Sequence, residues 1–188
     1  ALVRSNIKET QTGVPLTLNI TIQNAACVAI PNAQVYIWHC TKAGVYSGYN
    51  NSMNPGTVGS TYLRGIQTTN ASGQVTFETI YPGWYNGRLT HIHCEVYVAN
   101  VLILTSQFAF PLDSTAGSPT ALVNAANGQG NNTITSYSGD NVFSDGYTSQ
   151  LLSLTGSVAA GYTASPTFII NYTVTPLTLI SFTAGMEN

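Results

Sequence analysis

Short runs in which apolar and polar residues alternate recur along this chain and restrict it to a β fold. The clearest run covers residues 14–22, and residues 33–38 repeat the pattern after the turn signal Ile30-Pro31-Asn32. Alternate side chains of a strand lie on the same face of a sheet, so a period of two is typical of a half-buried strand. The two runs and the short turn between them predict a β-hairpin. Further strands are expected at residues 65–69, 75–79, 89–99, 101–110, 132–137, 150–156 and 167–174.

Signals for helices are weak, and turn residues separate the predicted strands at short intervals. Asn70-Ala71-Ser72-Gly73 predicts a turn between two of the strands, and residues 119–126 could form one short helix. About seven to nine short strands with frequent turns are typical of a sandwich. The predicted fold class is therefore all-β, an antiparallel β-sandwich with little helix. Residues 1–174 are expected to form this domain and residues 175–188 a C-terminal tail.

Charged residues are scarce, at 6% of the chain against about 25% in an ordinary soluble domain. With 5 Lys and Arg, 7 Asp and Glu and no basic run, the chain has little to neutralise phosphates, which argues against a nucleic-acid partner. No apolar run approaches the roughly 20 residues that span a bilayer, so no membrane span is expected. Uncharged Thr, Ser and Asn supply the polar surface, as is common in secreted β proteins.

Ala1 is not an initiator Met and no signal peptide is present. Together with the composition, this predicts a mature or trimmed form of a secreted or cell-envelope protein. No sequence feature indicates the oligomeric state.

The chain has 3 cysteines, which cannot all pair internally. Cys27 and Cys40 flank the turn around Pro31, and a disulfide between them is as compatible with the sequence as two free thiols. Cys94 follows a histidine in a predicted strand, which favours a small buried apolar residue over a reactive thiol.

Two of the 3 histidines form a His-x-His pair. His91 and His93 are two positions apart in a predicted strand, so both rings leave the same face and can bind one metal ion. In an ordinary domain such a pair is more often solvated or hydrogen-bonded, but the scarcity of histidine in this chain favours the metal site. Glu95 continues the same face as a candidate third ligand, whereas Cys94 points to the opposite face.

Tyrosine is the oxygen donor that the chain has in excess, with 11 residues. A phenolate is a hard anionic ligand that suits ferric iron, and a bound metal would remove the phenol proton. For any single tyrosine, aromatic packing with the hydroxyl at the surface is the simpler interpretation. Those in the same segment as the histidine pair are Tyr46, Tyr49, Tyr62, Tyr81 and Tyr85.

A series of ordered motifs surrounds these residues. They are Val35-Tyr36-Ile37-Trp38-His39-Cys40, Gly44-Val45-Tyr46-Ser47, Leu63-Arg64-Gly65-Ile66-Gln67, Tyr81-Pro82-Gly83-Trp84-Tyr85 and Gly87-Arg88-Leu89-Thr90-His91-Ile92-His93. In this order the motifs resemble the intradiol ring-cleavage dioxygenases, the family of the catechol 1,2- and protocatechuate 3,4-dioxygenases. The short secreted branch of that family, a bare β-sandwich, is the most similar.

The resemblance implies a non-haem Fe(III) cofactor, a catecholic small-molecule substrate and O2. It implies intradiol cleavage of the ring to cis,cis-muconate-type diacids. By position in the motifs, the implied iron ligands are Tyr46, Tyr85, His91 and His93. The implied catalytic residues are Arg88, Gln107 and Tyr85, whereas His39 is implied to be structural or to act behind the ligands.

A secreted β-sandwich module that binds glycans or a protein partner through exposed Tyr and Trp would have the same composition. Metal analysis distinguishes the two functions, because such a module has no reason to hold one iron per chain.

Overall fold

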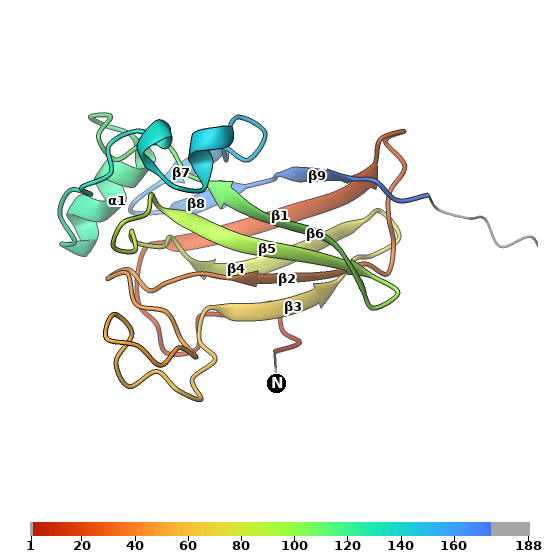
Figure 1. The fold of residues 1–188 in the computed structure, drawn as a ribbon, viewed down its shortest axis with the longest axis horizontal. Helices are drawn as coiled ribbons and strands as arrows, with labels where there is room; N and C mark the ends of the chain where they lie inside the picture. The colour runs from red at the N-terminus through yellow and green to blue at the C-terminus, as the bar shows by residue number, and fades with distance from the viewer. Residues whose placement is uncertain (1, 174–188) are drawn as a thin grey trace, which may run out of the picture.

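The computed structural model describes residues 2–173 and shows two β-sheets packed face to face (Figure 1). One sheet has the strand order β3-β2-β5-β6 and the other β4-β1-β8-β7, with β9 also paired to β1. The first sheet consists of β2 (Gln34–Trp38), β3 (Arg64–Thr68), β5 (His91–Val98) and β6 (Val101–Ala109). The second consists of β1 (Pro15–Asn24), β4 (Gln74–Ile80), β7 (Leu154–Ser157), β8 (Gly161–Ala164) and β9 (Thr167–Ile170). The predicted all-β sandwich is confirmed, and the pairing is mostly antiparallel, although β8 and β9 run parallel to β1.

The core lies between the sheets and is built from the alternating apolar positions. In β1 every second residue is buried, and β5 repeats this pattern along its length. Each fully buried Leu or Ile contributes about 1.5–3 kcal/mol to folding relative to an exposed one. The buried residues of β1 and β5 therefore contribute much of the free energy of unfolding. The fully buried residues of the two strands are Leu16, Leu18, Ile20, Ile22, Ile92, Cys94 and Val96.

The predicted hairpin between residues 14–22 and 33–38 is wrong, because β1 and β2 lie in different sheets. Strand β1 pairs with β4, placing Leu18 opposite Phe77, whereas β2 pairs with β3 and β5. After a short return along β1, at which Ile30 donates to the carbonyl of Ile22, the chain crosses to the other sheet. Alternation specifies which face of a strand is buried but not which strand lies beside it. The turn predicted at residues 70–73 is present, and it likewise connects the two sheets from β3 to β4.

The strand predicted at residues 132–137 is also wrong. This segment is irregular and leads into a 3₁₀ helix, Tyr137–Gly139, which is followed by a second, Phe143–Asp145. Side chains replace a strand partner here, since Asn132 accepts a hydrogen bond from the Ile134 amide and donates one to the Arg88 carbonyl.

The short helix predicted at 119–126 is confirmed as α1 (Pro119–Asn127), which lies with the two 3₁₀ helices at one end of the sandwich (Figure 1). Ser118 caps its first turn by accepting from the Ala121 amide, and Gly128 ends it at a φ of 71°. Strand β9 begins at Thr167 as predicted but ends at Ile170, while residue 174 and the predicted tail at 175–188 lie outside the described residues. Within residues 2–173, no helix is long and apolar enough to cross a membrane.

All three cysteines are free, so the disulfide considered for Cys27 and Cys40 is not formed. Cys27 is exposed, whereas Cys40 and Cys94 are buried. Burial raises the pKa of the Cys40 thiol to about 12 and also raises that of Cys94.

We therefore expect one fast-reacting thiol per folded chain. Titration with dithionitrobenzoate at pH 8 should label Cys27 within minutes, because it is accessible, and should label the other two only after unfolding in guanidinium. A Cys27→Ser variant should lose the fast phase alone. Two fast thiols in the wild type would contradict the buried positions of Cys40 and Cys94.

Candidate metal centre

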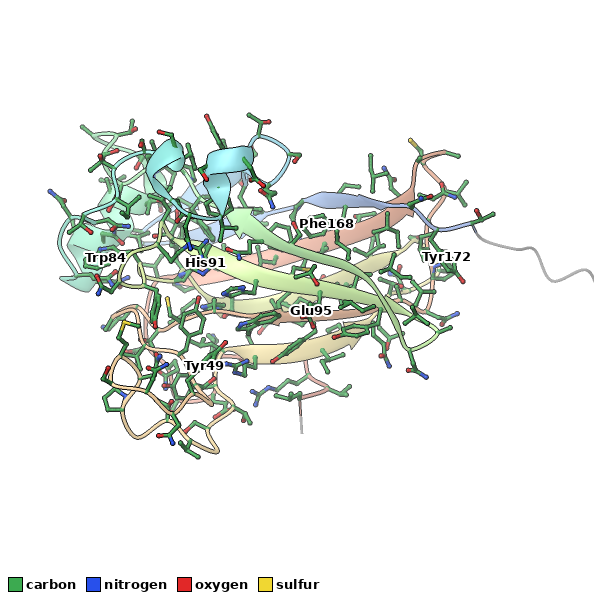
Figure 2. All side chains as sticks on the ribbon, viewed as in Figure 1. Tyr49, Trp84, His91, Glu95, Phe168 and Tyr172 are labelled. Carbon is green, nitrogen blue, oxygen red and sulfur yellow. The ribbon has the colours of Figure 1, made fainter. Side chains whose placement is uncertain are left out.

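Two histidine rings project from the start of β5, at the end of the sandwich where the long loops gather. His91 lies opposite Ala109 of β6, and His93 lies between Trp38 of β2 and Gln107 of β6. Both rings leave the same face of the sheet, as the sequence predicted, and this is the outer face. Figure 2 places His91 at the same end as Tyr49 and Trp84.

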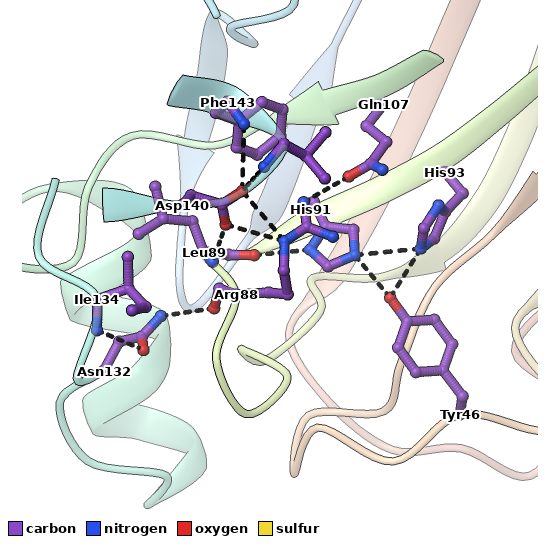
Figure 3. A network of polar contacts seen from close by, with 11 residues as sticks. Tyr46, Arg88, Leu89, His91, His93, Gln107, Asn132, Ile134, Asp140 and Phe143 are labelled. Carbon is purple, nitrogen blue, oxygen red and sulfur yellow. Dashed lines mark hydrogen bonds and ion pairs between the residues drawn. The ribbon is translucent and has the colours of Figure 1, made fainter. Parts of the chain in front are cut away.

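Three donor atoms from these strands and one loop form a small triangle (Figure 3). Tyr46 Oη is 2.8 Å from His91 Nε2 and 3.2 Å from His93 Nε2, and the two Nε2 atoms are 3.1 Å apart. Two ligands bound at right angles about 2.1 Å from one metal ion lie about 3 Å from each other. The triangle therefore has the dimensions of three adjacent ligands of a single ion.

The ring nitrogens are oriented for this role. Nδ1 of His91 donates to the Leu89 carbonyl at 2.6 Å, which leaves the lone pair of Nε2 facing the triangle. The His93 ring stacks on Trp38 with a centroid distance of 4.5 Å and an interplanar angle of 2°, which restricts its rotation. His93 Nε2 lies 3.1 Å from His91 Nε2, within hydrogen-bonding distance, so the two nitrogens are directed at the same point.

Burial keeps all three donors uncharged in the absence of a metal. It lowers the pKa of His91 to about 4 and that of His93, with help from the neighbouring His91, to about 3. Burial also raises the pKa of the Tyr46 phenol well above its usual value. At neutral pH the two imidazoles are thus ready ligands, whereas Tyr46 must lose a proton to a metal before it can bind as phenolate.

The loop that carries Tyr46 is held from two sides. The Tyr46 amide donates to Asn54 Oδ1 at 2.6 Å, and the next residue, Ser47, accepts hydrogen bonds from Arg64 at its carbonyl (2.6 Å) and hydroxyl (2.9 Å). The Arg64 guanidinium also lies 5.2 Å above the Tyr49 ring. Because these contacts fix the backbone beside Tyr46, its phenol points at the histidines without a strand to position it.

Tyr85 joins the same pocket from a different loop. Its ring packs edge-on against Tyr46 with centroids 5.2 Å apart, and its hydroxyl makes no hydrogen bond to any of residues 2–173. The backbone just before it is clamped by Gln129, whose side-chain amide accepts from the Trp84 amide at 2.9 Å and donates to the Trp84 carbonyl at 2.7 Å. The fourth predicted ligand is therefore near the triangle but not hydrogen-bonded to it.

Arg88 and Gln107 lie beside the histidines and are bonded to each other. Arg88 Nη2 donates to Gln107 Oε1 at 2.8 Å, and Arg88 Nε donates to both carboxylate oxygens of Asp140 at 3.0 and 3.1 Å. The Arg88 side chain is 13% exposed and that of Asp140 is fully buried. The two residues predicted to be catalytic thus share one polar network at the pocket wall (Figure 3).

Asp140 organises this network, and the sequence analysis did not identify it. Besides Arg88, its carboxylate accepts from the Leu89 amide at 2.7 Å, the Val142 amide at 2.9 Å and the Phe143 amide at 3.2 Å. Burial raises the pKa of Asp140, but the hydrogen bonds from Arg88 and the backbone outweigh it and hold the pKa below its ordinary value. The scarcity of acids in the chain, 7 in all, was the one signal that could have drawn attention to it.

The triangle opens into a cavity of about 290 Å³. Besides the two histidines and Tyr46, its walls are formed by Tyr49, Asn51, Asn54, Tyr85 and Arg88. Pockets for drug-sized ligands occupy about 300–1,000 Å³, so this cavity suits a molecule of one or two rings.

Two other candidates lie away from the pocket. Glu95 accepts a hydrogen bond from Tyr97 at 2.6 Å and lies nearer the middle of the sheet (Figure 2), so it is not a third ligand. Both ring nitrogens of His39 are engaged, with the Cys40 carbonyl at 2.8 Å and Thr79 Oγ1 at 2.7 Å, which agrees with a structural role. In the described part of the chain no three His, Cys, Asp or Glu side chains gather as metal ligands.

Comparisons with known proteins agree with this geometry. A family model described as "Dioxygenase" matches residues 1–148. An intradiol ring-cleavage dioxygenase from Tetranychus urticae aligns over 90% of this chain and 87% of its own, with a TM-score of 0.79 and 27% identity. The 3-chlorocatechol 1,2-dioxygenase from Rhodococcus opacus 1CP shares the fold, with a TM-score of 0.59 and 18% identity over 88% of this chain and 64% of its own.

A dioxygenase domain from Streptomyces sp. SirexAA-E, part of a fusion with a carbohydrate-binding protein, also shares the fold, with a TM-score of 0.66 and 23% identity over 91% of this chain and 89% of its own. Among curated proteins no sequence matches this one. Since the family model spans well over half of the sequence, the chain belongs to the intradiol ring-cleavage dioxygenase family.

Proposed function

We propose that this protein is an extracellular, non-haem Fe(III)-dependent dioxygenase that cleaves catechol-type aromatics with O2 to cis,cis-muconate-type diacids. The observation that carries the proposal is the triangle of Tyr46 Oη and the Nε2 atoms of His91 and His93, at the base of a cavity that fits a small aromatic ring. Tyr85, in contact with Tyr46, would be the fourth ligand.

The donor set suits ferric iron. Two neutral imidazoles and two phenols that can lose their protons offer two anionic oxygens and two nitrogens, and phenolate oxygen is a hard donor. Bound there, Fe(III) would supply a Lewis-acidic, redox-active centre at which a catecholate and O2 react.

The protein itself would supply proton acceptance, positioning and charge. Tyr85 Oη, held as a phenolate when the metal is bound, would accept one of the two catechol protons, and no hydrogen bond from a described residue competes for it. Arg88 bonds Asp140 through Nε and Gln107 through Nη2, and it lines the cavity, where a fixed cation would stabilise negative charge that develops on the ring. Gln107 and Asp140 keep that guanidinium in place.

An iron assay combined with a visible spectrum and oxygen uptake tests the proposal. We expect about one iron per chain, a burgundy-red colour from tyrosinate-to-Fe(III) charge transfer, and oxygen consumption with catechol that yields a muconate-type diacid. A colourless protein with a full complement of iron would contradict the tyrosine ligands. A protein that retains no iron would instead support the glycan- or protein-binding alternative.

The two tyrosines Tyr46 and Tyr49 form a matched pair for mutation. They pack edge-on with centroids 5.6 Å apart, but only Tyr46 reaches the histidine nitrogens. Tyr46→Phe is expected to weaken and shift the charge-transfer band and to lower iron affinity by at least about 10–100-fold, since it removes an anionic ligand. Tyr49→Phe should leave the band and the iron content unchanged. Equal effects of the two variants, measured by absorption and metal analysis, would show that Tyr46 does not bind the metal.

A further inference from the structure

The cavity above the triangle contains a single charged side chain. Of the residues that line it, Arg88 is the one Lys, Arg, Asp or Glu, and the rest are tyrosines, asparagines and the two histidines. An adjacent hollow of about 380 Å³, which shares Tyr85 with the cavity and includes Val45, Met53 and Trp84, has no charged residue in its lining. A substituent on a bound ring therefore meets apolar and uncharged polar groups whether it points into the cavity or into this hollow.

Arg88 already has an anionic partner. Asp140 is fully buried and holds Arg88 Nε through both carboxylate oxygens at 3.0 and 3.1 Å. In the proposed function this guanidinium acts on the reacting ring, so a charged substituent would have to compete with the ring and with Asp140 for it.

The other four basic residues of the chain do not supply a cation either. Arg64 is committed to the Ser47 carbonyl (2.6 Å) and the Tyr36 hydroxyl (2.9 Å), and Arg4 pairs with Glu9 at 2.6 Å. Lys8 and Lys42 line neither the cavity nor the hollow. With 5 Lys and Arg in the whole sequence, this accounts for every lysine and arginine of the chain.

We infer that this site selects catechols with uncharged substituents and rejects those with an anionic substituent, such as a ring carboxylate. The inference rests on the proposed function and narrows its substrate class. An ionised carboxylate that enters the cavity loses part of its hydration without meeting an unpaired cationic side chain, which is unfavourable. An amide or an alkyl group of the same size has no such penalty.

A pair of ligands with the same shape isolates the charge. We expect the iron-loaded protein to bind 3,4-dihydroxybenzamide at least about tenfold more tightly than 3,4-dihydroxybenzoate, a factor of ten being the effect of about 1.4 kcal/mol. The dissociation constants are measured anaerobically by equilibrium dialysis at pH 7, where the benzoate is ionised, and the ratio of kcat/KM in air should follow the same order. Equal or tighter binding of the benzoate overturns the inference.

Met53 provides the position for a variant that reverses the charge effect. Its side chain is 46% exposed in the hollow, outside the proposed ligands and the Arg88 network. Met53→Lys, which adds a cation on an unbranched chain of similar length, is expected to reduce the benzamide-to-benzoate preference about threefold or more at low salt and less at high salt. Met53→Gln should leave the preference unchanged. A preference that Met53→Lys does not reduce would rule out charge as its cause.

The outcome also separates the inference from the proposed function. If the iron-loaded protein binds neither ligand and consumes no oxygen with catechol, the proposed function fails and the inference fails with it. If catechol is cleaved and the benzoate is bound as well as the benzamide, the function stands and only the inference is overturned.

Discussion

His91→Ala is expected to leave the protein without stoichiometric iron. The substitution removes one corner of the triangle and leaves only His93 Nε2 and Tyr46 Oη, 3.2 Å apart, as adjacent donors. Loss of residues that merely support a metal ligand costs about 10–100-fold in metal affinity, so loss of the ligand itself should cost at least 100-fold. The measurement is the iron content after loading and desalting, together with the visible band. A second readout is thermal unfolding, in which iron should raise the midpoint of the wild type and not that of His91→Ala.

His39 serves as the control for this experiment. It is also a fully buried histidine, but its ring nitrogens are bonded to the Cys40 carbonyl and to Thr79. His39→Gln should lower the unfolding midpoint of the apoprotein and still permit loading with one iron per chain. If His91→Ala retained stoichiometric iron, the triangle would not be the metal site.

Asp140→Asn is expected to reduce kcat/KM with catechol by about 10²–10³-fold while iron is retained. The asparagine has no charge and cannot accept all the hydrogen bonds that the carboxylate accepts, so Arg88 would lose its fixed position beside the ring. Loss of a preorganised electrostatic group typically lowers the rate by a factor of this size. The protein should also lose about 3–5 kcal/mol of stability, because Arg88, only 13% exposed, is left without its partner.

Asp145 is the matched control, since it is an exposed aspartate five positions later in the same segment. Asp145→Asn should change neither kcat/KM nor stability. An Asp140→Asn variant with wild-type turnover would show that the ion pair has no role in catalysis.

The contribution of Asp140 to the free energy of unfolding should decrease as the pH is lowered. Its pKa in the folded protein lies below the ordinary value of 3.8, so its contribution is fully present above that value and disappears as the pH falls through the lower folded pKa. The difference in unfolding free energy between the wild type and Asp140→Asn, measured by urea titration, should be constant between pH 6 and 7 and should shrink below about pH 4. A difference that grows on acidification would contradict the lowered pKa.

Local patterns in the sequence account for much of the fold. Alternation identified β1, β2 and β5 because a strand that is buried on one face must place every second side chain in the core. The short helix expected at residues 119–126 is likewise local, since in the structure Ser118 caps its start and Gly128 its end. Residues 132–137 were also assigned to a strand, but there Asn132 accepts a local hydrogen bond from the Ile134 amide and donates a tertiary one to the Arg88 carbonyl in place of a strand partner.

For the candidate site, the sequence by itself determined that His91 and His93 share one face of a strand, and the family motifs directed attention to Tyr46, Tyr85, Arg88 and Gln107. Only the tertiary structure decided that Tyr46 Oη lies 2.8 Å from His91 Nε2 across 45 positions of sequence, and that Asp140 holds Arg88 across 52. It also decided that Glu95 lies away from the candidate metal site. Cys27 and Cys40 are free and form no disulfide. The physical reason is that periodicity encodes the face on which a side chain lies, whereas distances between segments depend on how two sheets and their loops pack.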